Sequence, residues 1–251
     1  AVLFWMLNKF PNIKKAVIND VNTDLIITYK AIKDSITGLV SQLKTWEKEY
    51  HQFKADADAR KVYYYEKRTL FNSRSKDEVT KAALFIFLNR TCFNGLYRVN
   101  KSNGFNVPIG SYKTPMICDE ENLYAVSEVL QRVEILNGDF EETLKHVEGQ
   151  TFFYFDPPYK PLSESSSFNS YAKGGFNDSE QIRLRDYCKK LHNEGHSWVL
   201  SNSDVKGWVE DGDFFDSLYA DFNIFRVLAR RAINSKGEGR GELNELLIRN
   251  Y

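Results

Sequence analysis

The sequence has little cysteine and no long apolar run. Its 251 residues include three widely spaced cysteines, Cys92, Cys118 and Cys188, without a CxxC pair. The four histidines have no ligand spacing relative to them, so we expect neither a disulfide framework nor a bound metal. No stretch approaches the roughly 18 apolar residues of a spanning helix, and no secretion leader is evident. We therefore expect a cytoplasmic globular protein, with 42% hydrophobic residues for its core.

An excess of either charge is also absent, because 34 Lys and Arg balance 34 Asp and Glu. The distribution is nevertheless uneven. Residues 79–118 contain no acid but five cations, Lys81, Arg90, Arg98, Lys101 and Lys113. A second basic cluster comprises Arg226, Arg230, Arg231, Lys236 and Arg240. Local positive patches on a neutral chain are typical of a protein that contacts phosphates with one surface.

The most informative stretch is a run of β-branched and aromatic residues that ends in a proline turn. Residues 151–155 predict a short strand buried on both faces, followed by Asp156-Pro157-Pro158-Tyr159. Two prolines cannot continue a strand ladder, and they make the turn stiff. Ligands of open α/β sheets bind beyond the carboxyl ends of the strands, so we expect a ligand site here. The alternative is a turn with a purely structural role.

Two further acids end predicted strands. Asp20 follows residues 14–19 and precedes a helix that begins near Asp24, and Asp139 follows residues 133–138. In nucleotide-binding α/β folds, an acid in the position of Asp20 accepts hydrogen bonds from ribose hydroxyls. Alternatively, each acid caps the helix that follows it, and for Asp139 both roles are compatible.

Residues 93–110 are rich in Asn, Gly and aromatics. Ser102-Asn103-Gly104 predicts a hairpin turn between residues 96–99 and residues 105–107. A projecting hairpin that carries Arg98 and Asn94 is suited to reading the major groove of DNA. An ordinary surface hairpin is the alternative. We refer to residues 93–110 as the hairpin.

These motifs together resemble one enzyme family. Asp156-Pro157-Pro158-Tyr159 resembles the DPPY motif of amino-methyltransferases, which use S-adenosylmethionine to methylate an exocyclic nitrogen of a DNA base. Asn-Gly-Leu-Tyr-Arg-Val-Asn at 94–100 and Phe-Asn-Val-Pro-Ile-Gly at 105–110 resemble the recognition hairpin of the Dam-like adenine-N6 methyltransferases, which read GATC. The resemblance covers nearly the whole chain, and the order of motifs matches the α-group, D12 class.

The resemblance implies a fold, a reaction and partners. It implies an α/β fold with a Rossmann-like methyltransferase sheet, formed by residues 1–35 and 120–251. Residues 36–119 would form an inserted helical and β-hairpin DNA-recognition domain. The implied reaction is methyl transfer from S-adenosylmethionine to adenine N6 in double-stranded DNA. A monomer in a bacterial or phage-infected cytoplasm, with a cognate restriction endonuclease as a possible partner, is expected.

The resemblance also assigns site residues. It places the catalytic roles on Asp156, Pro157, Pro158 and Tyr159. The expected cofactor ligands are Asp20 for the ribose, Asp139 and Phe140 for the adenine, and Asp156. The expected DNA contacts are Phe93 as the wedge that fills the space of the flipped base, and Asn94, Leu96, Arg98, Asn100, Pro108 and Lys113. No metal ligand is expected.

One departure from the family pattern stands out. The Phe-x-Gly-x-Gly loop that wraps the methionine half of the cofactor is not found before Ala1, so we expect that the sequence starts inside the natural chain or that the loop was lost. A catalytically impaired DNA-binding relative would explain such a loss, and a methyltransferase acting on RNA or protein glutamine would keep the tetrapeptide without the hairpin. The polar residues 163–176 are predicted to form a lid or DNA-contacting loop.

Overall fold

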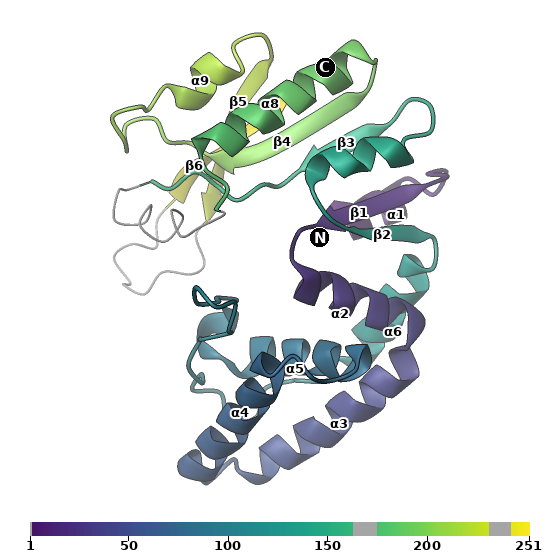
Figure 1. The fold of residues 1–251 in the computed structure, drawn as a ribbon, viewed down its shortest axis with the longest axis vertical. Coiled ribbons are helices and arrows are strands. Elements are labelled where there is room, and N and C mark those ends of the chain that lie inside the picture. The colour runs from purple at the N-terminus through teal and green to yellow at the C-terminus, as the bar shows by residue number, and fades with distance from the viewer. Residues whose placement is uncertain (1, 163–174, 231–241) are drawn as a thin grey trace. The chain divides into compact units, whose positions relative to one another are not determined.

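The computed structural model describes residues 2–162, 175–230 and 242–251 (Figure 1). The chain divides into two compact units, Ala1–His146 and Val147–Tyr251, which are described separately below. Among the described residues, no helix has the length and apolar character needed to cross a membrane. The predicted division into catalytic and DNA-recognition domains stays a prediction.

The first unit contains a small parallel sheet. Strand β1, Ala16–Asp20, pairs in parallel with β2, Val133–Asn137, and Asp20 lies opposite Asn137. The chain enters the sheet through α1 (Val2–Lys9) and leaves it through a 3-10 helix, η2 (Phe140–His146). Helices α2 (Thr23–Asp34) and α6 (Glu120–Leu130) pack against each other and against β2. Both strands that were predicted to end in an acid are therefore present.

Between α2 and α6 the chain is mostly helical up to residue 95. This part consists of α3 (Ile36–Gln52), α4 (Ala57–Asn72) and α5 (Glu78–Thr91), followed by the short 3-10 helix η1 (Phe93–Gly95). Its core is aromatic, with Tyr50, Tyr64 and Phe87 fully buried. Tyr63 packs against both Tyr50 and Phe87, with ring centroids 6.3 and 5.8 Å apart.

The second unit contains a four-stranded mixed sheet. Its elements are β3 (Phe152–Phe155), α8 (Asp178–Asn193), β4 (Ser197–Ser203), α9 (Phe214–Leu218), β5 (Asn223–Arg230) and β6 (Glu242–Arg249). The strand order is β3-β4-β6-β5; β3 and β4 are parallel, and β6 runs antiparallel to both of its neighbours. Helix α8 lies along β4 (Figure 1). The parallel β3-α8-β4 unit carries the Asp156 turn.

The prediction that the strand before Asp156 is buried on both faces is wrong. Phe153 is buried, but Phe152 and Tyr154 are 41% and 39% exposed. Strand β3 is at the edge of the described sheet, and only one of its faces is covered: Phe153 and Phe155 pack against Tyr187 of α8. An unbroken run of apolar residues does not distinguish an edge strand from a central one, because it lacks the alternation that marks an exposed face.

The α/β class is confirmed, since the chain combines helices with parallel and mixed sheets. The described strands form two separate hydrogen-bonded sheets, of two and four strands. The inserted recognition domain stays a prediction.

Candidate active site and DNA-reading hairpin

The Asp156-Pro157-Pro158-Tyr159 turn begins where β3 ends. Because β3 and β4 are parallel and Phe155 lies opposite Leu200, Asp156 is beside Ser201. The Ser201 Oγ is 3.1 Å from Asp156 Oδ1 and 3.3 Å from the Phe155 carbonyl oxygen. Among the described residues, neither Asp156 Oδ2 nor the Pro157 carbonyl has a hydrogen-bond partner. The turn therefore presents two acceptors to a ligand.

Tyr159 ends the turn and is 37% exposed. Burial of the phenol raises the pKa of Tyr159; a hydrogen bond with Ser201 opposes this rise and the nearby charge of Asp156 adds to it. The side chain is therefore neutral at physiological pH. A neutral, partly exposed ring beside a carboxylate is suited to stacking against a base.

Three buried polar side chains hold the turn from behind. Gln181 is 1% exposed, and its Nε2 donates to the Pro158 carbonyl at 3.0 Å. Asn202, fully buried, accepts from the Lys160 N–H at 3.0 Å through Oδ1 and donates to Gln181 Oε1 at 3.2 Å. The Ser203 hydroxyl donates to the Lys160 carbonyl. Because both flanks of the turn are hydrogen-bonded to buried groups, its position is fixed from several sides.

Sequence reasoning missed these positioning residues. The polar run from Ser201 to Asp204 is visible in the sequence at the end of β4. Pairing this strand in parallel with the strand before Asp156 would have placed the run beside the proline turn. For Gln181 no such signal exists, since a glutamine in the first turn of a charged helix usually faces solvent.

In the first unit, the structure brings together the predicted cofactor ligands Asp20, Asp139 and Phe140. They are at the adjacent carboxyl ends of β1 and β2, where the Asn137 Nδ2 donates to the Asp20 carbonyl at 2.8 Å. The Asn19 Nδ2 donates to the carbonyls of Gly138 and Asp139, both at 3.0 Å. Asn19 thus fixes the loop that carries Asp139.

The interpretation that each acid caps the helix after it fails for Asp20 and holds for Asp139. Helix α2 is capped by Asn22, whose Oδ1 accepts from the N–H groups of Asp24 and Leu25, so the interpretation of Asp20 as its cap is wrong. Asp20 Oδ1 instead accepts from the Asn22 N–H at 2.7 Å. Asp139 Oδ1 accepts from the Glu141 N–H at 3.0 Å and so caps the following turn.

The hairpin reverses direction where its sequence predicted. Antiparallel bridges join Val99 to Phe105 and Cys92 to Ile109, in place of two regular strands. The side chain of Asn100 closes the turn, because its Oδ1 accepts from the N–H groups of Ser102 and Gly104 at 3.0 and 2.8 Å. A continuous ladder is prevented by Pro108, which lacks an N–H, and by Asn94, whose φ is 53°.

Most of the predicted DNA contacts are accessible on this hairpin. Asn94 is half-buried, and the exposed members are Phe93, Leu96, Arg98, Asn100 and Pro108; Lys113, which follows the hairpin, is exposed as well. The Arg98 Nε donates to Asn106 Oδ1 at 2.7 Å, which orients the guanidinium across the hairpin. The return limb is anchored to α4, where Tyr64 donates to the Val107 carbonyl at 2.9 Å and Asn72 bonds both backbone groups of Phe105.

The second basic cluster is only partly described. Its Arg226 is ion-paired with Asp204 at 2.9 Å and Asp216 at 2.7 Å, so two carboxylates already neutralise its charge. The side chains of Arg230, Arg231, Lys236 and Arg240, and residues 163–174 of the predicted lid, lie outside the described residues.

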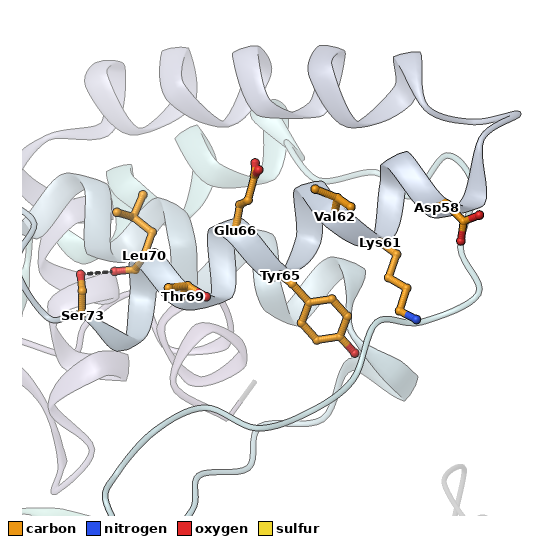
Figure 2. A pocket seen from close by; sticks show the side chains of 8 residues that line it. All are labelled: Asp58, Lys61, Val62, Tyr65, Glu66, Thr69, Leu70 and Ser73. Atoms are coloured by element: carbon orange, nitrogen blue, oxygen red, sulfur yellow. Dashed lines mark hydrogen bonds between the residues drawn. The ribbon is translucent and has the colours of Figure 1, made fainter.

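Elsewhere in the first unit, a hollow of about 790 Å³ lies along one flank of α4 (Figure 2). Its lining side chains come from that helix and from the residue that follows it: Asp58, Lys61, Val62, Tyr65, Glu66, Thr69, Leu70 and Ser73. None of the predicted site residues lines it. The described residues contain no cluster of three His, Cys, Asp or Glu side chains that could hold a metal ion, and the three cysteines are free thiols.

The sequence profile of the D12 class of N6 adenine-specific DNA methyltransferases matches residues 1–233. The chain belongs to this family. It is 48% identical over 254 residues to the type II methyltransferase M.MjaIII of Methanocaldococcus jannaschii, an alignment that covers 100% of this chain and 85% of that protein. It is 40% identical to M1.LlaDCHI of Lactococcus lactis (95% and 80% covered) and 34% identical to a DNA adenine methylase of Vibrio cholerae (93% and 79% covered).

The predicted activity is thereby confirmed: the protein is an adenine-specific DNA methyltransferase. Family membership decides against the alternative that the protein is a methyltransferase acting on RNA or on protein glutamine. It also assigns the protein to a class whose chemistry depends on S-adenosylmethionine in general.

Proposed function

We propose that this adenine-specific DNA methyltransferase transfers a methyl group from S-adenosylmethionine to adenine N6 within GATC sites of duplex DNA. The observation that carries the proposal is the pair of acceptors, Asp156 Oδ2 and the Pro157 carbonyl, on a turn fixed by buried side chains. The hairpin with its exposed Arg98 supports the choice of site.

The adenine amino group needs such acceptors because its lone pair is delocalised into the ring. Asp156 accepts a hydrogen bond from one amino proton and the Pro157 carbonyl accepts the other. The nitrogen then becomes more tetrahedral, with its lone pair aimed at the methyl carbon. Bound S-adenosylmethionine would supply the methyl group to this nitrogen, and the amino proton that is lost would leave on the side of Asp156. Positioning and electrostatics supply the catalysis.

The target base has to leave the duplex, since N6 cannot be reached inside the stack. In this proposal the neutral ring of Tyr159 stacks against the flipped adenine, and Phe93 fills the space that it leaves. Phe93 and Leu96 are both exposed large apolar side chains of the hairpin.

The acceptor groups around β1 and β2 fit the adenosyl half of the cofactor. Asp20 and Asp139 offer carboxylate oxygens, and Asn19 Oδ1 is buried with no hydrogen-bond partner among the described residues. Ribose hydroxyls and an adenine amino group are donors, and they match this set of acceptors. We assign Asp20 to the ribose, and Asp139 and Phe140 to the adenine. When bound, S-adenosylmethionine supplies the electrophilic methyl group.

The runner-up is a relative that binds its site without catalysis. The supported turn counts against it, because a protein that only binds DNA has no need of two free acceptors on a rigid tetrapeptide. In our proposal the enzyme works as a monomer in the cytoplasm, on the same site as a cognate endonuclease. The relatives from Methanocaldococcus jannaschii and Lactococcus lactis are both named type II methyltransferases, and these names support the proposal of a cognate endonuclease.

The test is product identification. A GATC duplex is incubated with the protein and S-adenosylmethionine, digested to nucleosides and analysed by mass spectrometry. We expect N6-methyladenine from GATC and far less from duplexes with one base changed. Duplex binding without any methylated adenine supports the runner-up and overturns the proposal.

A further inference from the structure

Asp24 connects two regions of the first unit that the proposed function treats separately. It lies in the first turn of α2, and its side chain is 10% exposed. Its Oδ1 is ion-paired with Arg74, and its Oδ2 accepts from the Tyr97 hydroxyl at 3.0 Å. Arg74 comes from the connection between α4 and α5, whereas Tyr97 belongs to the hairpin. We call these three residues the Asp24 cluster.

On one side, the Asp24 cluster is joined to the proposed ribose ligand. Asn22 donates its N–H to Asp20 Oδ1 at 2.7 Å and accepts from the Asp24 N–H at 3.1 Å through its own Oδ1. Two hydrogen bonds thus separate the Asp20 carboxylate from the backbone of Asp24. A ligand that bonds Asp20 therefore acts directly on the segment that positions Asp24.

On the other side, the cluster holds both limbs of the hairpin. The Arg74 Nη2 donates to the carbonyl of Asn103 in the turn at 2.7 Å. The Tyr97 ring packs on Phe105 of the return limb, with ring centroids 5.9 Å apart. Arg74 adopts a left-handed backbone with φ 57°, an uncommon conformation for a residue with a side chain and one that clusters at functional sites.

The cluster also fixes the segment that carries the reading residues. Tyr97, itself 37% exposed, donates its hydroxyl to Asp24, and its neighbours Leu96 and Arg98 are exposed on the hairpin. Burial, and then the charge of Asp24, raise the pKa of Tyr97 to about 12. The phenol therefore stays a hydrogen-bond donor over the whole range in which the enzyme can be assayed.

We propose that the Asp24 cluster couples the cofactor segment to the hairpin, so that occupancy at Asp20 and reading of the cognate site stabilise each other. Asp24, Arg74 and Tyr97 act as positioning residues, and none of them contacts the reacting atoms. The coupling is reciprocal, because linkage requires each ligand to raise the affinity of the other by the same factor. The inference rests on the proposed roles of Asp20 and the hairpin.

The experiment is calorimetry with sinefungin, a cofactor analogue without a transferable methyl group. Its dissociation constant is measured for the full-length chain alone, with a GATC duplex and with a duplex of changed sequence. We expect the cognate duplex to tighten binding by roughly 5- to 150-fold, the usual range of allosteric coupling. The changed duplex should have little effect. A wild-type protein without this difference overturns the inference.

Three variants and a control locate the coupling. Asp24→Asn removes the charge that pairs with Arg74, Arg74→Gly removes the guanidinium but suits the left-handed backbone, and Tyr97→Phe removes only the hydroxyl. In the first two variants the cognate duplex should leave the sinefungin dissociation constant almost unchanged. In Tyr97→Phe it should lower this constant by a smaller factor than in the wild type. Lys76→Gln removes an exposed charge two residues from Arg74, and it should keep the wild-type ratio.

Melting temperatures show which variants are folded. If Asp24→Asn and Arg74→Gly do not fold, the conservative Tyr97→Phe variant decides whether the cluster carries the coupling. Wild-type coupling in the folded variants, or its loss in Lys76→Gln, overturns the inference. Failure of the proposed function is seen separately, as the absence of N6-methyladenine from the wild-type reaction.

Discussion

The Asp156–Tyr159 turn and the hairpin are both irregular segments with exposed functional residues, but they are held in different ways. The turn is bonded by Gln181, Asn202 and Ser203, all buried polar groups of its own unit. The return limb of the hairpin is bonded to Tyr64 and Asn72 of α4, whereas its turn and leading limb are tied through the partly exposed Arg74 and through Tyr97, whose ring packs on Phe85 and Phe105. A rigid frame suits chemistry, in which small misplacements are costly. The leading limb, which carries Leu96 and Arg98, has fewer such anchors, and this suits a segment that adjusts to DNA.

Removing the acid of the turn should have the largest effect. Asp156→Ala removes an acceptor from the amino group, and we expect methyl transfer to fall by at least about 10²–10³-fold. Duplex affinity should remain near wild type, because the hairpin is unchanged. Methyl transfer and electrophoretic mobility shift are measured in parallel, with the exposed Asp211→Ala as the matched control. Near-normal turnover in Asp156→Ala would remove the carboxylate from the mechanism.

Weakening the hydrogen bonds that hold the Asp156–Tyr159 turn should have the next largest effect. Gln181→Met keeps the volume of the side chain but removes the donor to the Pro158 carbonyl. We expect kcat to fall by roughly 10²-fold, as for a small misplacement of reacting groups, while KM for DNA changes little. Stability should fall by about 1–3 kcal/mol, since Asn202 and Pro158 lose a partner. Ile182→Ala, at the exposed neighbouring position, is the control, and an equal loss of kcat there would refute the role.

On the hairpin, the predicted effect is on sequence choice. A guanidinium that bonds one guanine twice contributes about 1–3 kcal/mol of discrimination, whereas a lysine on phosphate contributes without regard to sequence. Arg98→Ala should therefore relax base choice. Lys113→Ala should weaken binding to all duplexes and lower the salt slope by about one. Methylation of single-base variants of GATC distinguishes the two, and a uniform loss in Arg98→Ala would show a backbone contact.

The smallest effect is expected at Tyr159. Burial raises the pKa of its phenol, so the ring stays neutral as the pH rises towards 10. Stacking requires the ring and not its ionisation, so Tyr159→Phe should retain most of the wild-type turnover. The pH profiles of the two proteins between pH 7 and 10 should run parallel. A limb of the wild-type profile that disappears in Tyr159→Phe would show that the hydroxyl takes part in the reaction.

The same comparison shows what could be predicted from the sequence. Strand ends, the proline turn and the hairpin reversal depend on neighbouring residues, so local patterns identified Asp20, Asp139, Asp156 and Asn103. The contacts that hold the turn and the hairpin join residues far apart in the sequence: Gln181 is 23 positions from Pro158, and Arg74 is 50 positions from Asp24. No periodicity encodes such pairs. The burial of β3 was mispredicted because an edge strand with an apolar exposed face has the same sequence pattern as a buried one.

The most direct test of the central claim, that the turn performs the chemistry and the hairpin reads the site, is the single-turnover methylation rate at saturating cofactor and duplex. It is measured for Gln181→Met and Arg98→Ala on GATC and on its single-base variants. We predict that Gln181→Met lowers the rate on every duplex and keeps the wild-type ratio between cognate and changed sites. Arg98→Ala should keep the cognate rate and lose the ratio. Parallel loss of rate and ratio in both variants would contradict the account.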